Sequence, residues 1–234
     1  MSLNHENETL AESAARQIEA LDLHPERPLI LCDADEVIFA FVAALEDYLT
    51  SQGLTLTLRS FALTGNITEN ASGRVLEHDE VRGHLAGFYD ARAHAIDAVP
   101  GVQEAMGRLS AAASVVVLTN LALEHRPGRE QALRRIGLEL PVIANSGLKG
   151  PAARALADKV AAPVFFIDDI PHNHASVAVH APAVTRLHFI ADSRLAAMIG
   201  KADTADARID DWPAATDWIL RRIDEWRPQP AAAD

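Results

Sequence analysis

Two pairs of aspartates each follow directly on an apolar segment of the chain. Asp33 and Asp35 end one such segment, and Asp168 and Asp169 end another. Ionised carboxylates that lie close together repel one another unless a hard cation such as Mg²⁺ lies among them. If both segments are strands of one sheet, the four carboxylates predict a metal-dependent active site at its edge.

The composition sets the outer limits on fold and function. With 234 residues, 49% of them hydrophobic, the chain is long enough for one domain of ordinary size and a smaller insertion. A net charge of −12 argues against nucleic-acid binding, which needs basic stripes that the sequence lacks. The polar N-terminus and the absence of a long apolar stretch predict a soluble, cytoplasmic protein with no membrane partner. The single cysteine, Cys32, lies inside an apolar segment and is expected to be a buried, inert side chain.

Apolar segments alternate with segments of helical periodicity. Near-continuous apolar strands are expected at residues 29–33, 114–119, 141–144, 163–167 and 184–190. Amphipathic helices are expected at residues 10–21, 102–109, 131–136, 152–160 and 213–226, with a frayed end at 228–234. Alternation of this kind is typical of right-handed βαβ crossovers. We therefore expect an α/β fold, a three-layer, Rossmann-like, doubly wound parallel sheet that binds its ligand at the carboxyl ends of the strands.

One connection is much longer than a crossover requires. Roughly eighty residues separate the first two expected strands, which an inserted cap explains most simply. We place a mainly helical cap at residues 40–97, with a polar middle at 57–73, and the catalytic core at residues 1–39 and 98–234. Charged cap side chains usually face water, so no single one of the following is favoured as a substrate ligand: Arg59, Arg74, Arg82, His84 and Arg92.

Four short motifs occur in a fixed order between residues 29 and 173. They are Asp33-Ala34-Asp35 after the first strand, Thr119-Asn120 after the second, a lysine before a helix at Lys149, and the acid pair at 168–169. Each motif alone is weak evidence, since any of these side chains could simply cap a helix or end a strand. Together, in this order and strand context, they make the chain resemble the phosphatase-like branch of the haloacid dehalogenase superfamily. True dehalogenases lack the second aspartate of the first motif, so Asp35 argues for a phosphatase.

The resemblance implies a role for each residue in phosphoryl transfer. Asp33 is expected to be the nucleophile that forms an aspartyl-phosphate, and Asp35 the general acid and base. Thr119 and Asn120 are expected to bind phosphoryl oxygens. Lys149 is expected to hold the nucleophile and the phosphate together.

The resemblance also implies a Mg²⁺ site. Its expected ligands are the carboxylates of Asp33 and Asp169 and the backbone carbonyl of Asp35. Asp168 ranks second as a direct ligand because it could instead orient water or Lys149, and Asn173 ranks third. Imidazoles are poor ligands for an oxygen-lined Mg²⁺ site, so His172 and His174 are expected to be loop or outer-layer residues.

One residue departs from the family pattern. Glu36 follows Asp35, where the phosphatase motif commonly has glycine. We expect Glu36 to be accommodated by a backbone that avoids positive φ, with its carboxylate near the leaving-group side of the site.

The preferred hypothesis is a Mg²⁺-dependent hydrolase of a small phosphorylated metabolite, either a nucleotide monophosphate or a sugar phosphate. A phosphomutase or phosphotransferase on the same scaffold is the enzymatic alternative. A binding or regulatory protein that keeps the fold and has lost turnover is the alternative from another class. A monomer and a homodimer both remain open.

Overall fold

A parallel sheet of six strands forms the centre of the protein. The computed structural model describes residues 8–226. The strands lie in the order β5-β4-β1-β6-β7-β8, and all neighbours pair in parallel. Their bounds are β1 (Leu29–Cys32), β4 (Ser114–Asn120), β5 (Val142–Asn145), β6 (Val164–Asp168), β7 (Thr185–His188) and β8 (Ala207–Arg208).

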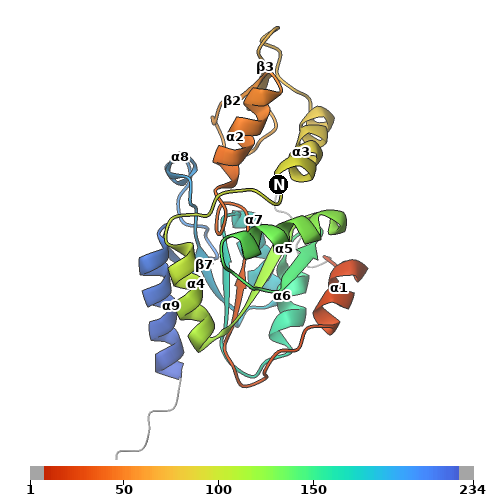
Figure 1. Cartoon of the computed structure of the whole chain (residues 1–234). Coiled ribbons are helices and arrows are strands. Elements are labelled where there is room, and N and C mark those ends of the chain that lie inside the picture. The colour runs from red at the N-terminus through yellow and green to blue at the C-terminus, as the bar shows by residue number, and fades with distance from the viewer. Residues whose placement is uncertain (1–7, 227–234) are drawn as a thin grey trace, which may run out of the picture.

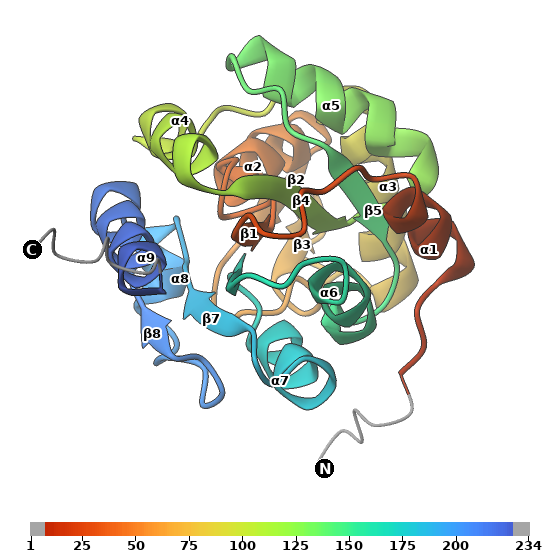
Figure 2. The same cartoon turned by 90° about the horizontal axis from the view of Figure 1, so that it is seen from below.

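Helices cover both faces of this sheet, as Figure 2 shows in a view along the strands. On one face lie α4 (Val102–Ala112), α5 (Arg126–Arg135) and α9 (Trp212–Trp226); on the other lie α1 (Glu12–Glu19), α6 (Gly150–Ala157) and α7 (Pro171–His180). Successive side chains of a strand point to opposite faces of the sheet. Ile30 therefore packs in the core under α4, α5 and α9, and Leu31 in the core under α1, α6 and α7. The predicted three-layer α/β fold is confirmed.

Most of the expected elements are present with slightly different ends. The five expected strands are all formed, whereas β8, the 3-10 turn at Leu123–His125, α7 and α8 (Ser193–Ala196) were not predicted. β8 is too short to show a pattern, and α7 carries only a weak apolar stripe. Cys32 is fully buried, and its burial, together with the charge of Asp33, raises the pKa of its thiol well above its usual range. The segment 228–234, expected to be frayed, lies outside the described residues.

The segment between β1 and α4 extends beyond the carboxyl ends of the strands (Figure 1). It contains α2 (Phe41–Ser51), β2 (Leu54–Leu56), β3 (Ile67–Glu69) and α3 (His78–Arg92). β2 and β3 pair antiparallel. β3 lies within the stretch 57–73 that we expected to be polar, and β2 directly precedes that stretch. Leu54 and Leu56 are buried and Thr55 between them is exposed. An alternating pattern of only three residues is too short to predict a strand from the sequence. Residues 40–97, termed the insertion below, are thus two helices joined through a small hairpin.

The chain enters and leaves the insertion at adjacent points. The Ala40 N–H donates to the Asp97 carbonyl at 2.9 Å, and the Val99 N–H donates to the Ile38 carbonyl at 2.8 Å. Phe39 and Ala98 pair between these two bonds. The two linkers therefore form a short paired ribbon on which the insertion stands.

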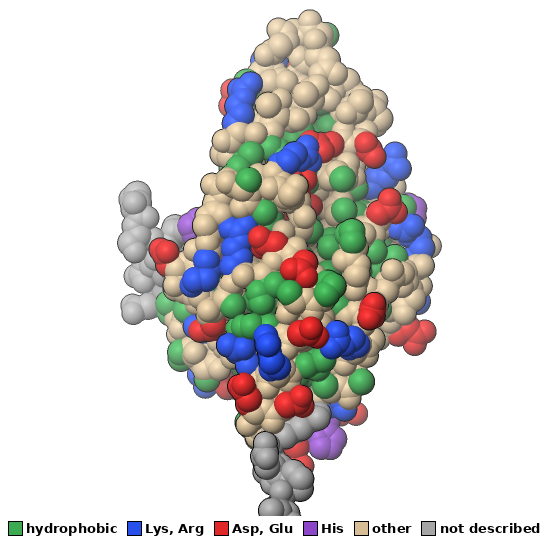
Figure 3. Space-filling model, turned by 90° about the vertical axis from the view of Figure 1, so that its left-hand side faces the viewer, with side chains coloured by type: hydrophobic (Ala, Val, Ile, Leu, Met, Phe, Trp, Pro, Cys, Tyr) green, Lys and Arg blue, Asp and Glu red, His purple; other side chains and the backbone are tan. Residues whose placement is uncertain are grey.

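An ion pair joins the insertion to the core away from the sheet. Arg194 of α8 donates two hydrogen bonds of 2.8 Å to the carboxylate of Glu46 in α2. The bidentate geometry fixes the orientation of both side chains. The flank that carries α8 and α9 shows acidic and basic side chains close together (Figure 3).

The start of α6 is held tightly against α7. The Gly150 N–H donates to Ser176 Oγ at 2.9 Å. A Cβ at position 150 would lie 2.5 Å from the Ser176 carbonyl oxygen and 2.7 Å from Cδ2 of His180. Gly150 is thus required for close approach of two helices, and it directly follows Lys149 in the third sequence motif.

Substitution of Gly150 tests this contact. We expect Gly150→Ala to lower the free energy of unfolding by about 1–3 kcal/mol, because α6 must shift away from α7. Gly107→Ala is the matched control: Gly107 is exposed in α4 and an added Cβ meets no atom within 4 Å. Urea unfolding of both variants would measure the difference. Equal stability of the two variants would contradict the packing argument.

Candidate active site

The carboxyl ends of three neighbouring strands bring the predicted site residues together. Asp33 directly follows β1, and its N–H donates to the Ile167 carbonyl of β6 at 2.9 Å. Thr119 lies near the end of β4 and Asp168 ends β6, on either side of β1. Asp33, Thr119 and Asp168 are all buried. The site thus lies between the sheet and the insertion.

Lys149 is the central cation of this group. Its Nζ lies 2.7 Å from Asp33 Oδ1 and 2.7 Å from Asp168 Oδ2. Burial alone would lower the pKa of the ammonium, but the charges of Asp168 and Asp33 hold this pKa above its usual range. Lys149 is therefore a fully buried, charged side chain that links the first motif to the fourth.

Asp168 is surrounded by donors. Besides Lys149, its carboxylate accepts the Ile170 N–H at 2.8 Å and the Asn173 side-chain amide at 3.0 and 3.2 Å. Both oxygens are thus engaged within the protein. This geometry favours Asp168 as the residue that orients Lys149, the second of the two roles considered from the sequence.

Asp33, Asp168 and Asp169 form a group that could hold a cation. One carboxylate oxygen from each lies within 4.8 Å of the others. Burial, followed by the charges of Asp168 and Asp33, raises the pKa of Asp169 well above its usual range. Burial likewise raises the pKa of Asp33, against the opposing charge of Lys149.

Asn173 lies beside this group, because its side-chain amide nitrogen donates to Asp168. Its Oδ1 is buried and accepts no hydrogen bond from any described residue. Buried polar atoms are usually paired, so an unpaired oxygen on a residue bound to Asp168 is compatible with the surroundings of a metal ion. An all-oxygen donor set of this kind suits Mg²⁺.

His172 and His174 lie on α7 and not in a loop, and His174 matches the other expected place, the outer layer of the site. His172 is exposed, whereas His174 is buried with Nε2 2.9 Å from the Asp168 backbone oxygen. Burial lowers the pKa of His174 to about 3, which keeps its ring neutral. His174 therefore supports the backbone beneath the carboxylates.

Asp35 has a partner on each side of the site. The Tyr89 hydroxyl, from α3 of the insertion, donates to Asp35 Oδ2 at 2.9 Å. Arg129 Nη2, from α5 of the core, donates to Asp35 Oδ1 at 2.6 Å. Burial raises the pKa of Asp35, while the charge of Arg129 opposes the rise. Neither partner was identified from the sequence.

The position of Arg129 was detectable in principle. Arg129 falls at helical spacing with the buried Ala132 and Leu133, so a charged residue lies on the apolar face of α5. Its guanidinium carbon lies 4.9 Å from the centre of the Phe39 ring and 6.0 Å from that of Tyr89. The arginine is thus fixed between the first linker and the insertion.

Tyr89 gives a weaker signal in sequence. It follows Phe88, which is the buried residue of the α3 stripe. Its ring lies 5.9 Å from that of His125 and 6.1 Å from that of Phe41, with interplanar angles of 28° and 27°. These contacts direct the hydroxyl toward Asp35.

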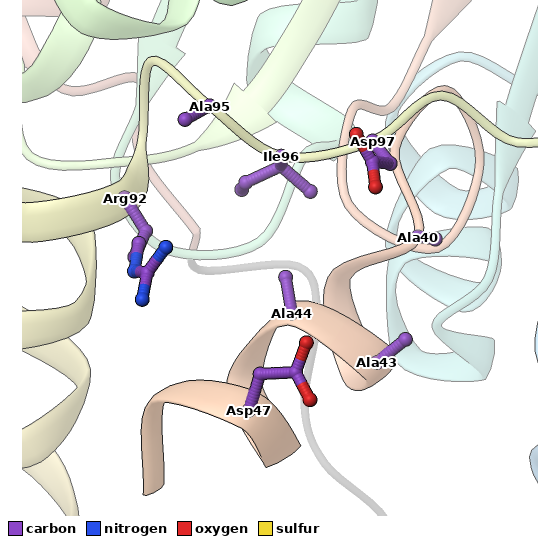
Figure 4. A pocket seen from close by; sticks show the side chains of 8 residues that line it. All are labelled: Ala40, Ala43, Ala44, Asp47, Arg92, Ala95, Ile96 and Asp97. Carbon is purple, nitrogen blue, oxygen red and sulfur yellow. The ribbon is translucent and has the colours of Figure 1, made fainter. Parts of the chain in front are cut away.

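The basic residues of the insertion lie elsewhere. Arg59, Arg74, Arg82 and Arg92 are exposed, and Arg74 pairs with Glu80 at 2.7 Å. Arg92 faces a cavity of about 240 Å³ between α2 and the return linker, together with Asp47 and Asp97 (Figure 4). The residues of the four motifs do not line this cavity.

The expectation that the backbone at Glu36 avoids positive φ was wrong. Its φ is +59°, in the left-handed region. Its carboxylate accepts the Val42 N–H of α2 at 2.7 Å and the Asp192 N–H at 2.8 Å. Left-handed backbone costs about 1–2 kcal/mol, which two hydrogen bonds to a carboxylate can offset. Burial raises the pKa of Glu36 to about 7.

Asn120 lies at the exposed side of the site. Its Oδ1 accepts the Asn145 side-chain amide at 2.8 Å, and the same amide of Asn145 donates to the Gly147 carbonyl at 3.1 Å. Because its oxygen is engaged, Asn120 presents its own amide nitrogen as the free donor. A free donor is the group that a phosphoryl oxygen requires.

No protein-family model matches the sequence, and no curated protein matches it either. Several solved structures are similar to this protein. A haloacid dehalogenase family hydrolase from Deinococcus radiodurans, with bound phosphate and sodium, aligns with 88% of this chain and 99% of its own, at 16% identity and a TM-score of 0.56. A putative hydrolase of that family from Bacillus subtilis, bound to magnesium, aligns with 84% of this chain and 99% of its own, at 13% identity and a TM-score of 0.57.

A third similar structure is a putative β-phosphoglucomutase from Bacteroides vulgatus. It covers 93% of this chain and 99% of its own, at 12% identity and a TM-score of 0.53. At such low identity the likeness concerns the fold, which agrees with the fold that the four motifs implied. The chain has the fold of the haloacid dehalogenase superfamily.

Proposed function

We propose that this protein is a Mg²⁺-dependent phosphomonoester hydrolase that works through an aspartyl-phosphate. The observation that supports this most directly is Lys149, buried between Asp33 and Asp168 at 2.7 Å from each. A buried ammonium in this position holds one carboxylate ready for attack and attracts a phosphoryl group to it.

In the first half-reaction, an oxygen of Asp33 attacks phosphorus. A bond forms between that oxygen and phosphorus, and the bond from phosphorus to the leaving oxygen breaks. Asp35 gives its proton to the leaving oxygen, which departs as an alcohol. The raised pKa of Asp35 supports this role, because an acid must carry a proton when the substrate binds.

In the second half-reaction, water attacks the aspartyl-phosphate. Asp35, now ionised, takes a proton from that water, and the bond between phosphorus and Asp33 breaks. Inorganic phosphate leaves and both carboxylates return to their starting state. Thr119 and the free amide of Asn120 bind phosphoryl oxygens during both steps.

Asp33, Asp169 and the backbone carbonyl of Asp35 would hold the Mg²⁺, with Asp168 and Asn173 beside them. Bound there, the ion would offset the negative charge of the carboxylates and of the phosphoryl group. The oxygen-only donor set and the unpaired Asn173 Oδ1 support this assignment.

The insertion, residues 40–97, acts in this proposal as a cap. Tyr89 reaches from it to Asp35, the residue that must contact the leaving oxygen. A leaving oxygen that takes its proton from Oδ2 of Asp35 would share this oxygen with the Tyr89 hydroxyl. Closure over a bound substrate then excludes bulk water from the reaction.

The substrate class is a small phosphorylated metabolite. The enclosed position of Asp33 and Asp35 under the insertion favours a small leaving group over a polymer. Within the described residues, no helix is long and apolar enough to cross a membrane. A phosphomutase, which would pass the phosphoryl group to a second hydroxyl, is the alternative, and the similarity to a putative β-phosphoglucomutase supports keeping it.

Phosphate release from a panel of phosphomonoesters with Mg²⁺ tests the proposal. We expect turnover by the wild type and a loss of roughly three orders of magnitude or more in Asp33→Asn, because the nucleophile is removed. Asp217→Asn, which changes an exposed acid paired with Arg108, is the control and should keep full activity. After reaction with a substrate labelled in its phosphate and quenching with acid, the wild-type protein should retain the label as an aspartyl-phosphate, and Asp33→Asn should not.

Asp35→Asn gives a separate test of the acid. Asparagine cannot supply the proton that Asp35 supplies. We therefore expect the hydrolysis rate of an alkyl phosphate to fall far more than that of an aryl phosphate, whose leaving group needs little protonation. No hydrolysis of any ester, or unchanged activity in Asp33→Asn, would refute the hydrolase. Activity that appears only with a bisphosphate primer would instead identify the phosphomutase.

Thermal unfolding tests the Mg²⁺ site independently of turnover. In EDTA, Asp169→Asn should raise Tm by about 2–4 °C, corresponding to roughly 1 kcal/mol, because one buried and repelled carboxylate is neutralised. Added Mg²⁺ should raise Tm of the wild type and leave Asp169→Asn nearly unchanged. Asp203→Asn, at an exposed position, should respond like the wild type. A full response in Asp169→Asn would exclude Asp169 as a ligand.

A further inference from the structure

Arg129 has more hydrogen-bonding capacity than the protein uses. Its side chain is fully buried, and Nη2 donates to Asp35 Oδ1 at 2.6 Å. Nε and Nη1 are also buried, and no described residue accepts a hydrogen bond from either. Each buried donor left without a partner costs about 1–3 kcal/mol. A guanidinium with two free nitrogens beside the general acid therefore requires a separate explanation.

The rings around Arg129 fix its position without pairing these nitrogens. Phe39 lies on the first linker and Tyr89 on the insertion, and both rings lie against the guanidinium. Aromatic faces attract the cation but offer no acceptor of the strength of an oxygen. The free N–H groups are thus held in place, next to the carboxylate that serves the leaving group.

We propose that Arg129 determines specificity by binding a second anionic group, a carboxylate or a phosphate, on the leaving group of the phosphomonoester. This inference rests on the proposed hydrolase function and names its substrate class. The planar fork of an arginine binds a carboxylate or a phosphate through two N–H donors. Phe39 and Tyr89 would contact the carbon skeleton between the two anions.

Matched substrates separate this inference from the general activity. The probes are the phosphate ester of a three-carbon hydroxy acid, its carboxamide, and an aryl phosphate without a second anion. We expect the wild type to favour the acid over the amide by roughly ten- to a hundredfold in kcat/KM. When the acid and the amide are titrated by calorimetry into the Asp33→Asn variant with Mg²⁺, the acid should bind with a Kd lower by a similar factor.

Substitutions then assign the preference to Arg129. Arg129→Met should reduce the ratio of kcat/KM for the acid to kcat/KM for the amide to about one, mainly by raising KM for the acid. Arg129→Lys should restore part of the ratio, because the charge is kept and the fork is lost. Arg126→Lys, which alters an arginine of the same helix paired with Glu130, should leave the ratio unchanged.

Each outcome decides one question. Turnover of the aryl phosphate establishes the hydrolase whether or not the acid is preferred. Equal use of acid and amide by the wild type would overturn the role of Arg129, and this result needs no variant to fold. Equal losses on both substrates in Arg129→Met would also overturn it, because they would mark Arg129 as a residue that only positions Asp35.

Discussion

The contact of Lys149 with two carboxylates is the interaction on which the arrangement of this protein depends. Asp33, Asp168 and Asp169 would repel one another at the edge of the sheet, and one ammonium offsets only part of that repulsion. Lys149 lies at the start of α6, Asp33 follows β1 and Asp168 ends β6. A small displacement of any one element would therefore leave a buried charge without its partner, which is far more unfavourable than an ordinary loss of packing.

The tight packing of α6 on α7 serves this contact. A hydrogen bond at Gly150 fixes the helix that carries Lys149, and Asn173 and His174 of α7 hold the side chain and backbone of Asp168. One pair of helices thus orients both ends of the ion pair. On the opposite side, Asp35 is held by one residue of the core and one residue of the insertion, so both parts of the protein set its surroundings.

Sequence patterns predicted the parts of this protein that depend on local chemistry. Apolar strands ending in acids located Asp33 and Asp168, and motif order placed Lys149 beside them. Long-range contacts were not predictable in this way: Arg129 and Tyr89 reach Asp35 across 94 and 54 residues of chain. Glu36 is the clearest example of a feature that the sequence could not predict. Its left-handed backbone is stabilised by the N–H groups of Val42 and Asp192, and only the folded chain brings Asp192 within reach.

The paired linkers at Ile38–Ala40 and Asp97–Val99 have an evolutionary consequence. Because the chain leaves and re-enters the core at neighbouring points, the intervening segment can be lengthened, shortened or exchanged without altering the sheet. One continuous piece of the gene therefore encodes a module whose replacement leaves every strand pairing of the six-stranded sheet in place.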